Sequence, residues 1–137
     1  MRQLLLRAAR IVNRDVVEGL HARGYSGLRS THTTLLSNMP LAGGTISEAA
    51  ERAGVTKQAM GRLAAELEAA GYIRVMGDPA DGRTRRLELT ESGTRLMLDS
   101  LDVMKGLEDG YAELIGRDRL RAVLDGLRAF SDDRGKP

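Results

Sequence analysis

Apolar residues between positions 45 and 70 recur with the spacing of two short helices. The first set, at i, i+3, i+4 and i+7, comprises Ile46, Ala49, Ala50 and Ala53. The second set forms a single stripe that comprises Met60, Leu63, Ala64, Leu67 and Ala70. Gly54 lies between the two sets and can adopt the left-handed conformation that ends a helix. The pattern therefore predicts two helices joined by a tight turn.

Polar residues mark where both helices begin. Thr45 and Glu48 form a capping box, in which the Thr45 hydroxyl accepts the Glu48 amide and the Glu48 carboxylate accepts the Thr45 amide. Thr56 is the N-cap of the second helix, and Val55 before it is placed to pack against Met60. The second helix therefore starts at a defined angle to the first.

The face of the second helix opposite its apolar stripe is small, polar and basic. It comprises Lys57, Gln58, Gly61, Arg62 and Ala65. Lys and Arg can pair with phosphate or guanine, and Gln can form two hydrogen bonds with adenine, so this face suits the major groove of DNA. A glycine inside a helix costs about 1 kcal/mol relative to alanine unless something comes close. Gly61 therefore indicates either approach to the groove or a tight helix crossing, and both interpretations stay open.

A β-hairpin with a basic tip is predicted after the second helix. Gly71 ends the helix, residues 72–76 are rich in strand-forming types, and residues 78–82 are turn formers. The returning segment alternates toward its end, which places Leu87 and Leu89 against the core. Its beginning carries three arginines in four positions: Arg83, Arg85 and Arg86. Any solvated hairpin can carry charge, but beside a helix with a polar face these arginines favour phosphate or minor-groove contact.

The order and spacing of these motifs resemble the MarR family of bacterial transcription regulators. The resemblance is continuous from Thr45 to Gly93 and rests on V-T-K-Q-A-M-G-R-L, E-L-E-A-A-G-Y, D-P-A-D-G-R and L-T-E-S-G. The segment T-K-Q-A-M is the most specific of them. The resemblance implies a mainly α-helical fold with a small β-wing, in which terminal dimerisation helices flank a winged helix-turn-helix DNA-binding lobe.

The resemblance also implies which residues touch DNA. Carried over position by position, contacts in the major groove and to phosphate come from Thr56, Lys57, Gln58, Gly61 and Arg62. Arg83 is the wing-tip arginine, Arg85 belongs to the same basic surface, and Asp81 would brace Arg83. Gly82 stands where the family often has a second basic or polar residue, so the tip is expected to be more mobile.

Helical patterns flank this central segment on both sides. The apolar positions of residues 2–23 spread around more than one stripe, which indicates burial against both the domain and a second chain. Residues 28–39 have a helical pattern that ends before a proline. Thr90 caps a helix of about 25 residues that ends at Gly116, with a bend or a close crossing expected at its two interior glycines. Residues 118–130 are the last predicted helix, and a disordered tail is expected after it.

These elements predict one MarR-like domain over residues 1–137, because a chain of this length fits a single domain. Its winged-helix DNA-binding lobe covers residues 28–90. Its dimerisation helices cover residues 1–24 and 91–131, since the terminal helices form the dimer in MarR-like proteins. Residues 132–137 are the expected disordered tail.

Composition narrows the chemistry. The chain has no cysteine, which excludes a disulfide, a thiolate zinc site and a thiol redox switch. Its formal net charge is only +2, yet DNA affinity follows the phosphates that a surface neutralises and not the total charge. We interpret His21 and His32 as surface or packing residues and expect no metal and no cofactor, because no carboxylate cluster accompanies them. No stretch approaches the roughly 20 apolar residues of a membrane span, so a soluble cytoplasmic protein is expected.

Together these features predict a sequence-specific DNA-binding transcriptional regulator. We expect a homodimeric repressor that binds double-stranded DNA at a pseudo-palindromic operator. The resemblance further implies a small aromatic or phenolic effector between the dimer helices and the DNA-binding lobe. The alternative is a winged-helix module that binds protein and not DNA, in which the exposed helix face would be apolar or acidic. An enzyme is not expected, since the sequence has no catalytic grouping, metal motif or phosphate loop.

Overall fold

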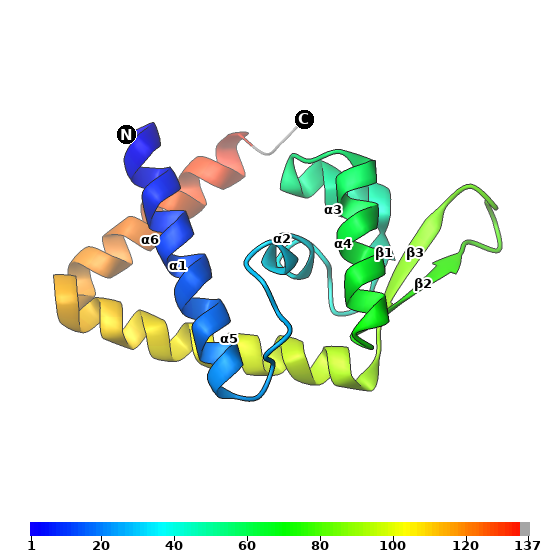
Figure 1. The fold of residues 1–137 in the computed structure, drawn as a ribbon. Helices are drawn as coiled ribbons and strands as arrows, with labels where there is room; N and C mark the ends of the chain where they lie inside the picture. Colours follow the sequence, from blue (N-terminus) through cyan, green and yellow to red (C-terminus); the bar gives the residue numbers. More distant parts are fainter. Residues whose placement is uncertain (135–137) are drawn as a thin grey trace. The chain divides into compact units, whose positions relative to one another are not determined.

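The computed structural model describes residues 1–134, which form six helices and three short strands. They are α1 (Arg2–Ala22), α2 (His32–Leu36), β1 (Gly44–Thr45), α3 (Ile46–Ala53), α4 (Lys57–Ala69), β2 (Ile73–Gly77), β3 (Arg85–Leu89), α5 (Glu91–Ile115) and α6 (Arg117–Arg134) (Figure 1). The chain divides into two compact units, which meet in sequence between Leu101 and Asp102. The predicted fold, mainly α-helical with a small β-wing, is confirmed. No helix of the described chain is both long enough and apolar enough to span a membrane.

The helix-turn-helix forms as its capping residues require. The Thr45 hydroxyl accepts the Glu48 amide at 3.1 Å, and the Glu48 carboxylate accepts the Thr45 amide at 3.1 Å. Gly54 ends α3 with a φ of +67°, a conformation that glycine adopts without strain. The Thr56 hydroxyl accepts the Ala59 amide at 3.1 Å and starts α4. The predicted capping box, glycine turn and N-cap are confirmed.

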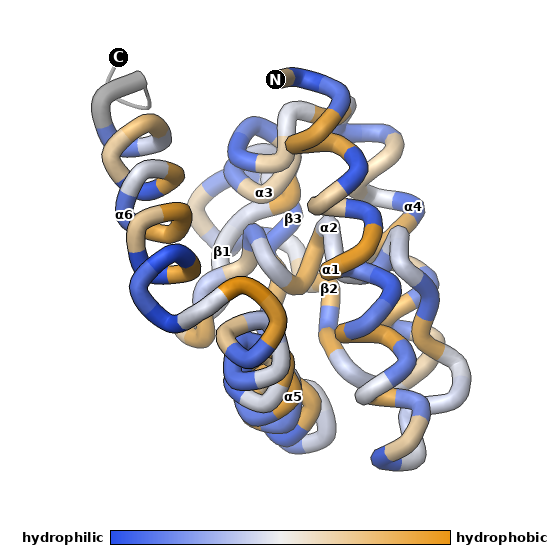
Figure 2. The backbone as a smooth tube through the Cα atoms, turned by 90° about the vertical axis from the view of Figure 1, so that its left-hand side faces the viewer, coloured by the Kyte–Doolittle hydropathy of each residue, from blue (hydrophilic) through white to orange (hydrophobic). Residues whose placement is uncertain are grey.

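One apolar core holds the elements of the first unit together. Its largest fully buried side chains are Leu20, Leu35, Met60, Leu67, Ile73, Leu87 and Leu96. They come from α1, α2, α4, β2, β3 and the first part of α5, so the core supports both the helix-turn-helix and the wing. In the second unit, hydrophobic and hydrophilic positions alternate around α6 (Figure 2), which is the pattern of a helix with one apolar side.

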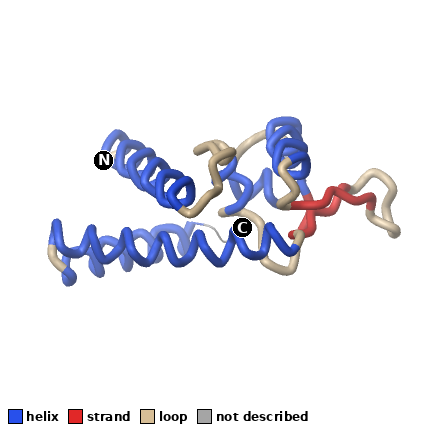
Figure 3. Tube along the Cα trace, turned by 60° about the horizontal axis from the view of Figure 1, so that its bottom comes forward, coloured by secondary structure: helices blue, strands red, loops and turns tan. Residues whose placement is uncertain are grey.

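The wing is a three-stranded antiparallel sheet in the order β1–β3–β2. β2 and β3 form the predicted hairpin with Val75 opposite Leu87, and the connecting turn extends beyond the strands (Figure 3). The two-residue strand β1 was not predicted and pairs with the other edge of β3, where Gly44 lies opposite Leu87. Leu87 thus lies in the central strand between both neighbours, and its side chain is 1% exposed.

The helix predicted at residues 28–39 is much shorter than expected, since only α2, five residues long, is helical. The Arg29 amide donates to Nδ1 of His32 at 3.0 Å. Such local bonds between side chain and backbone compete with the hydrogen-bond ladder of a helix. At the other end, Pro40 disfavours helical backbone in the residue before it.

α5 is continuous for 25 residues and passes through Gly106 and Gly110 without interruption. The hydroxyl of Thr90 accepts the Gly93 amide at 3.0 Å, so the predicted cap is confirmed. Gly116 follows the helix with a φ of +94°. The two interior glycines lower helix stability but remove no backbone donor, which is why the helix does not break at them.

α6 continues past the end predicted at residue 130 and reaches Arg134. The Ser131 hydroxyl donates to the Leu127 carbonyl at 2.8 Å, so this polar side chain is satisfied within the helix. Residues 132–134, which we expected in a disordered tail, are therefore helical. Residues 135–137 of that tail lie outside the described residues.

The α4–β2 corner is joined tightly to the start of α5. The Thr90 amide donates to the Tyr72 carbonyl at 3.0 Å, and the Thr90 hydroxyl donates to the Gly71 carbonyl at 2.6 Å. A Cβ atom built at Gly93 would lie only 1.8 Å from the Tyr72 carbonyl oxygen. The backbones pack so closely here that only glycine fits, which explains the glycine of the L-T-E-S-G motif.

Gly93→Ala is therefore expected to lower the free energy of unfolding by about 1–3 kcal/mol, because the added methyl group must push the corner and α5 apart. Urea unfolding followed by circular dichroism measures this change. Gly106→Ala is the matched control, since a Cβ atom there meets no described atom within 4 Å. The control should be neutral or stabilising by up to about 1 kcal/mol. Equal stability of Gly93→Ala and the wild-type protein would contradict this description of the joint.

Candidate nucleic-acid interface

The polar face of α4 is turned away from the core. Its exposed side chains are Lys57, Gln58, Arg62 and Ala65. The other side of the helix carries the fully buried residues Met60, Ala64 and Leu67. Because burial of these three residues fixes the rotation of the helix, the polar face is presented to solvent along its whole length.

Thr56 and Gly61 contribute to this face in different ways. Thr56 is exposed, and while its oxygen caps α4 its hydroxyl hydrogen is available to donate to a phosphate. A Cβ atom built at Gly61 meets no described atom within 4 Å. A tight helix crossing within the described chain therefore does not explain this glycine, which leaves close approach of another molecule as its interpretation.

The wing turn is organised by the carboxylate of Asp81. It accepts the Arg83 amide at 3.0 Å and the Thr84 hydroxyl at 3.0 Å. These two bonds, the Arg83 amide foremost, hold the pKa of Asp81 below its ordinary value. The expected bracing of Arg83 by Asp81 thus acts on the main chain, and the Arg83 residue remains exposed.

Four cations of this surface have no ion-pair partner among the described residues: Lys57, Arg62, Arg83 and Arg85. All four are exposed. Arg86 differs, because its guanidinium lies 3.8 Å from the Asp78 carboxylate and it is half-buried. An exposed cation without a counter-charge keeps its full attraction for a phosphate, so the four form a basic surface suited to nucleic acid.

Two glutamates of α4 have partners that the sequence did not indicate. Glu66 bonds to the Arg29 guanidinium and to Nε2 of His32, the latter at 2.8 Å. Glu68 accepts the Val75 amide at 2.5 Å. His32 is a buried, hydrogen-bonded residue, and the described chain has no group of three or more potential metal ligands. The sequence contains one indication of the roles of Glu66 and Glu68, which is that they are two acidic residues on a helix whose polar face is otherwise basic.

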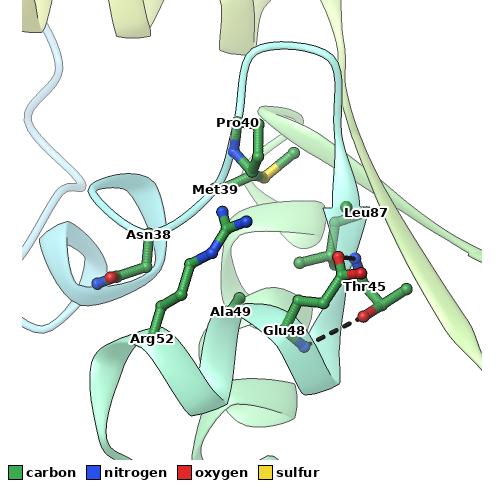
Figure 4. Close-up of a pocket in the computed structure, with 9 residues that line it drawn as sticks. Asn38, Met39, Pro40, Thr45, Glu48, Ala49, Arg52 and Leu87 are labelled. Carbon is green, nitrogen blue, oxygen red and sulfur yellow. Dashed lines mark hydrogen bonds between the residues drawn. The ribbon is translucent and has the colours of Figure 1, made fainter. Parts of the chain in front are cut away.

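Two hollows lie elsewhere in the molecule. The first lies beside α3, where the Arg52 side chain extends toward Pro40 (Figure 4), and it has no room for a water-sized molecule. The second has a volume of about 200 Å³ and lies within the second unit; it is lined by Glu108, Asp109, Ala112, Arg117, Leu120, Arg121, Leu124 and Arg128. Neither of these two hollows is lined by a residue of the basic surface.

A tight helix-turn-helix, an exposed polar helix face and a β-wing with an arginine at its tip together define a winged helix-turn-helix protein. Residues 26–84, which hold these elements, match the model of the MarR family. No curated protein matches the chain in sequence.

Solved structures of regulators share the fold over nearly the whole chain. A transcriptional regulator (MarR family) from Rhodococcus sp. RHA1 is 25% identical, with a TM-score of 0.77 over 93% of this chain and 89% of that chain. CouR from Rhodococcus jostii RHA1, bound to p-coumaroyl-CoA, is 25% identical with a TM-score of 0.71 over 93% and 89%. The transcriptional repressor CouR bound to a 23-mer DNA duplex gives 24% identity and a TM-score of 0.74 over 96% and 92%. Residues 26–84 therefore match the MarR family, and the chain as a whole shares the fold of MarR-family transcriptional regulators.

The lowered pKa of Asp81 predicts how the wing turn responds to acid. Because the folded-state pKa lies below the ordinary value of 3.8, the bonds of the ionised carboxylate stabilise the turn above that value. This stabilisation is lost as the pH falls through the lowered folded-state pKa. An NMR titration of the Asp81 carboxyl carbon should give a midpoint below 3.8, and the Arg83 amide signal should move with it. A midpoint at or above 3.8 would show that these bonds do not form.

Proposed function

We propose that this chain is a sequence-specific transcriptional regulator that binds double-stranded DNA as a homodimer. The observation that carries the proposal is the basic surface, with two exposed cations on α4 and two on the wing that lack an ion-pair partner in the described chain. Each cation that neutralises a phosphate releases a counterion, which contributes affinity that falls with salt. A winged helix-turn-helix offers such a surface in the form that fits a duplex.

In this proposal the leading end of α4 enters the major groove. Lys57 and Arg62 contact guanine or phosphate there, and Gln58 bonds to adenine. Arg83 and Arg85 on the wing bind phosphates or the adjacent minor groove. Contacts to base edges select the sequence, while contacts to phosphate set the register of the protein on the duplex.

Exposed apolar residues on the terminal helices support a homodimer. On α1 they include Leu4, Leu5, Leu6 and Ile11. In the second unit they include Leu114, Val123 and Leu127. Burial of such surface against a second copy contributes about 25 cal/mol per Å². Two copies related by a two-fold axis would read a pseudo-palindrome whose half-sites lie roughly one helical turn apart.

We also propose that the protein is a cytoplasmic repressor that responds to a small aromatic or phenolic effector. The support is the likeness to CouR, which is a transcriptional repressor and has been solved bound to p-coumaroyl-CoA. An effector changes DNA binding only if it binds the DNA-competent and DNA-incompetent conformations unequally. A compound that leaves operator affinity unchanged is therefore not the regulator.

A winged-helix module that binds protein and not DNA is the alternative. Such a module would carry an apolar or acidic face in place of Lys57, Gln58 and Arg62. The exposed cations of the basic surface favour DNA, because placing them against an apolar partner would cost their desolvation. The match of residues 26–84 to a family of transcriptional regulators supports a non-catalytic role.

Arg62→Ala and Arg83→Ala are each expected to weaken binding to the DNA that flanks the protein's own coding region by about 10-fold. Where the lost contact is to phosphate, the slope of log K against log salt should become shallower by about two, one contact from each subunit. Fluorescence anisotropy titrations at several stated salt concentrations measure both quantities.

Arg95→Ala is the matched control, because Arg95 is an exposed arginine of α5 that lies outside the basic surface and is not among the apolar residues that support the homodimer. Its affinity and salt dependence should equal those of the wild-type protein. Unchanged binding in both Arg62→Ala and Arg83→Ala would remove the assigned surface and with it the proposed function.

A further inference from the structure

Two glutamates in the second half of α4 tie this helix to other parts of the DNA-binding lobe. Glu66 bonds to the Arg29 guanidinium and accepts from Nε2 of His32 at 2.8 Å. Glu68 accepts the Val75 amide of β2 at 2.5 Å. At 3.6 residues per turn, the two side chains are separated by about 200° around the helix axis. They therefore hold α4 from two opposite sides, one toward α2 and one toward the wing.

The bond to Glu66 satisfies a buried donor. His32 is 6% exposed, and its Nδ1 accepts the Arg29 amide at 3.0 Å. The ring hydrogen therefore lies on Nε2, which donates it to Glu66. His32 first and Arg29 second hold the pKa of Glu66 below its ordinary value, so the carboxylate stays ionised. Loss of Glu66 would leave the buried His32 donor without this acceptor, so the contact of α2 with α4 depends on it.

The bond to Glu68 satisfies an amide at the edge of the wing. β2 is an outer strand of the sheet and pairs only with β3. The Asp78 amide donates to the Thr84 carbonyl across the hairpin, and successive amides of a strand point in alternate directions. The Val75 amide, three residues earlier, therefore faces away from β3 and would be open to solvent. The Glu68 carboxylate accepts a hydrogen bond from this amide and so joins β2 of the wing to α4.

We propose that Glu66 and Glu68 are positioning residues for DNA recognition, Glu66 by orienting α4 against α2 and Glu68 by orienting the wing against α4. The proposal rests on the proposed function of the DNA-binding lobe. A carboxylate beside DNA repels the phosphates, so neither residue adds affinity by direct contact. Their effect is exerted through Arg62 on the helix and Arg83 on the wing.

Double-mutant cycles on DNA binding by the full chain test this division of roles. Glu66→Ala is combined with Arg62→Ala, and Glu68→Ala with Arg83→Ala. In a variant without the glutamate the arginine is already displaced, so its removal weakens DNA binding less than it does in the wild-type protein. Each pair should therefore show a coupling of about 5-fold or more in DNA affinity. The crossed pairs, Glu66 with Arg83 and Glu68 with Arg62, are the matched controls and should be additive within about 2-fold.

Glutamine variants separate the effect of position from that of charge. Removing a negative charge from the DNA-binding lobe is expected to raise its affinity for DNA, whatever the position of that charge. Glu51→Gln, on the exposed surface of α3, measures this effect of charge without an effect of position. The oxygen of a glutamine side chain can still accept from His32 or Val75. The affinity of Glu66→Gln and of Glu68→Gln for DNA should therefore be no lower than that of the wild-type protein, within an error of about 2-fold. The affinity of each alanine variant should be lower by a factor of about 5 or more.

Thermal unfolding followed by circular dichroism shows whether each variant is folded. Where an alanine variant is not folded, the aspartate variant replaces it, because aspartate keeps the charge but is one methylene too short to reach. Alanine variants that bind as tightly as glutamine variants, or crossed pairs coupled as strongly as matched pairs, overturn the proposal. If the single variants Arg62→Ala and Arg83→Ala both leave DNA binding unchanged, the proposed function fails and this inference fails with it. If these single variants weaken binding but the cycles show no coupling, only this inference fails.

Discussion

Burial of one side of α4 is the constraint on which the rest of the structure depends. Met60, Ala64 and Leu67 are each 0% exposed. Full burial of a large apolar side chain contributes about 1.5–3 kcal/mol, so the helix cannot rotate about its axis without losing much of the stability of the lobe. The orientation of Lys57 and Arg62 toward solvent is thus a consequence of core packing and is set before any partner arrives.

The same lobe is coupled to α5 through contacts that leave little freedom. The Tyr25 hydroxyl donates to Asp99 at 2.5 Å, a bond that raises the pKa of Tyr25, and the Arg23 guanidinium lies 3.3 Å from the same carboxylate. The Tyr25 ring is 6.1 Å from the Tyr72 ring, at the corner where Gly93 admits no side chain. A displacement of the first part of α5 would therefore be passed to the α4–β2 corner, because packed elements move as bodies and do not deform continuously.

The features that could be predicted from the sequence are those that depend on interactions between residues close together in the chain. Thr45, Gly54 and Thr56 act on neighbours within four residues, so both helices of the helix-turn-helix and their turn were predicted correctly. β1 was missed because a two-residue strand exists only through its pairing with β3. The partners of Glu66 lie 34 and 37 residues away in the chain, a distance at which periodicity carries no information. The DNA contacts assigned to the basic surface stay predictions, since exposure does not identify a partner.

Amide chemical-shift mapping tests the central claim most directly, by titrating ¹⁵N-labelled protein with a duplex that contains the flanking DNA. If core packing presents α4 and the wing as a DNA-binding surface, the largest shifts will fall on residues 56–62 and 81–85, and the exposed residues of α6 will move little. Shifts concentrated on α6, or spread evenly over the chain with no maximum on α4, would contradict the account.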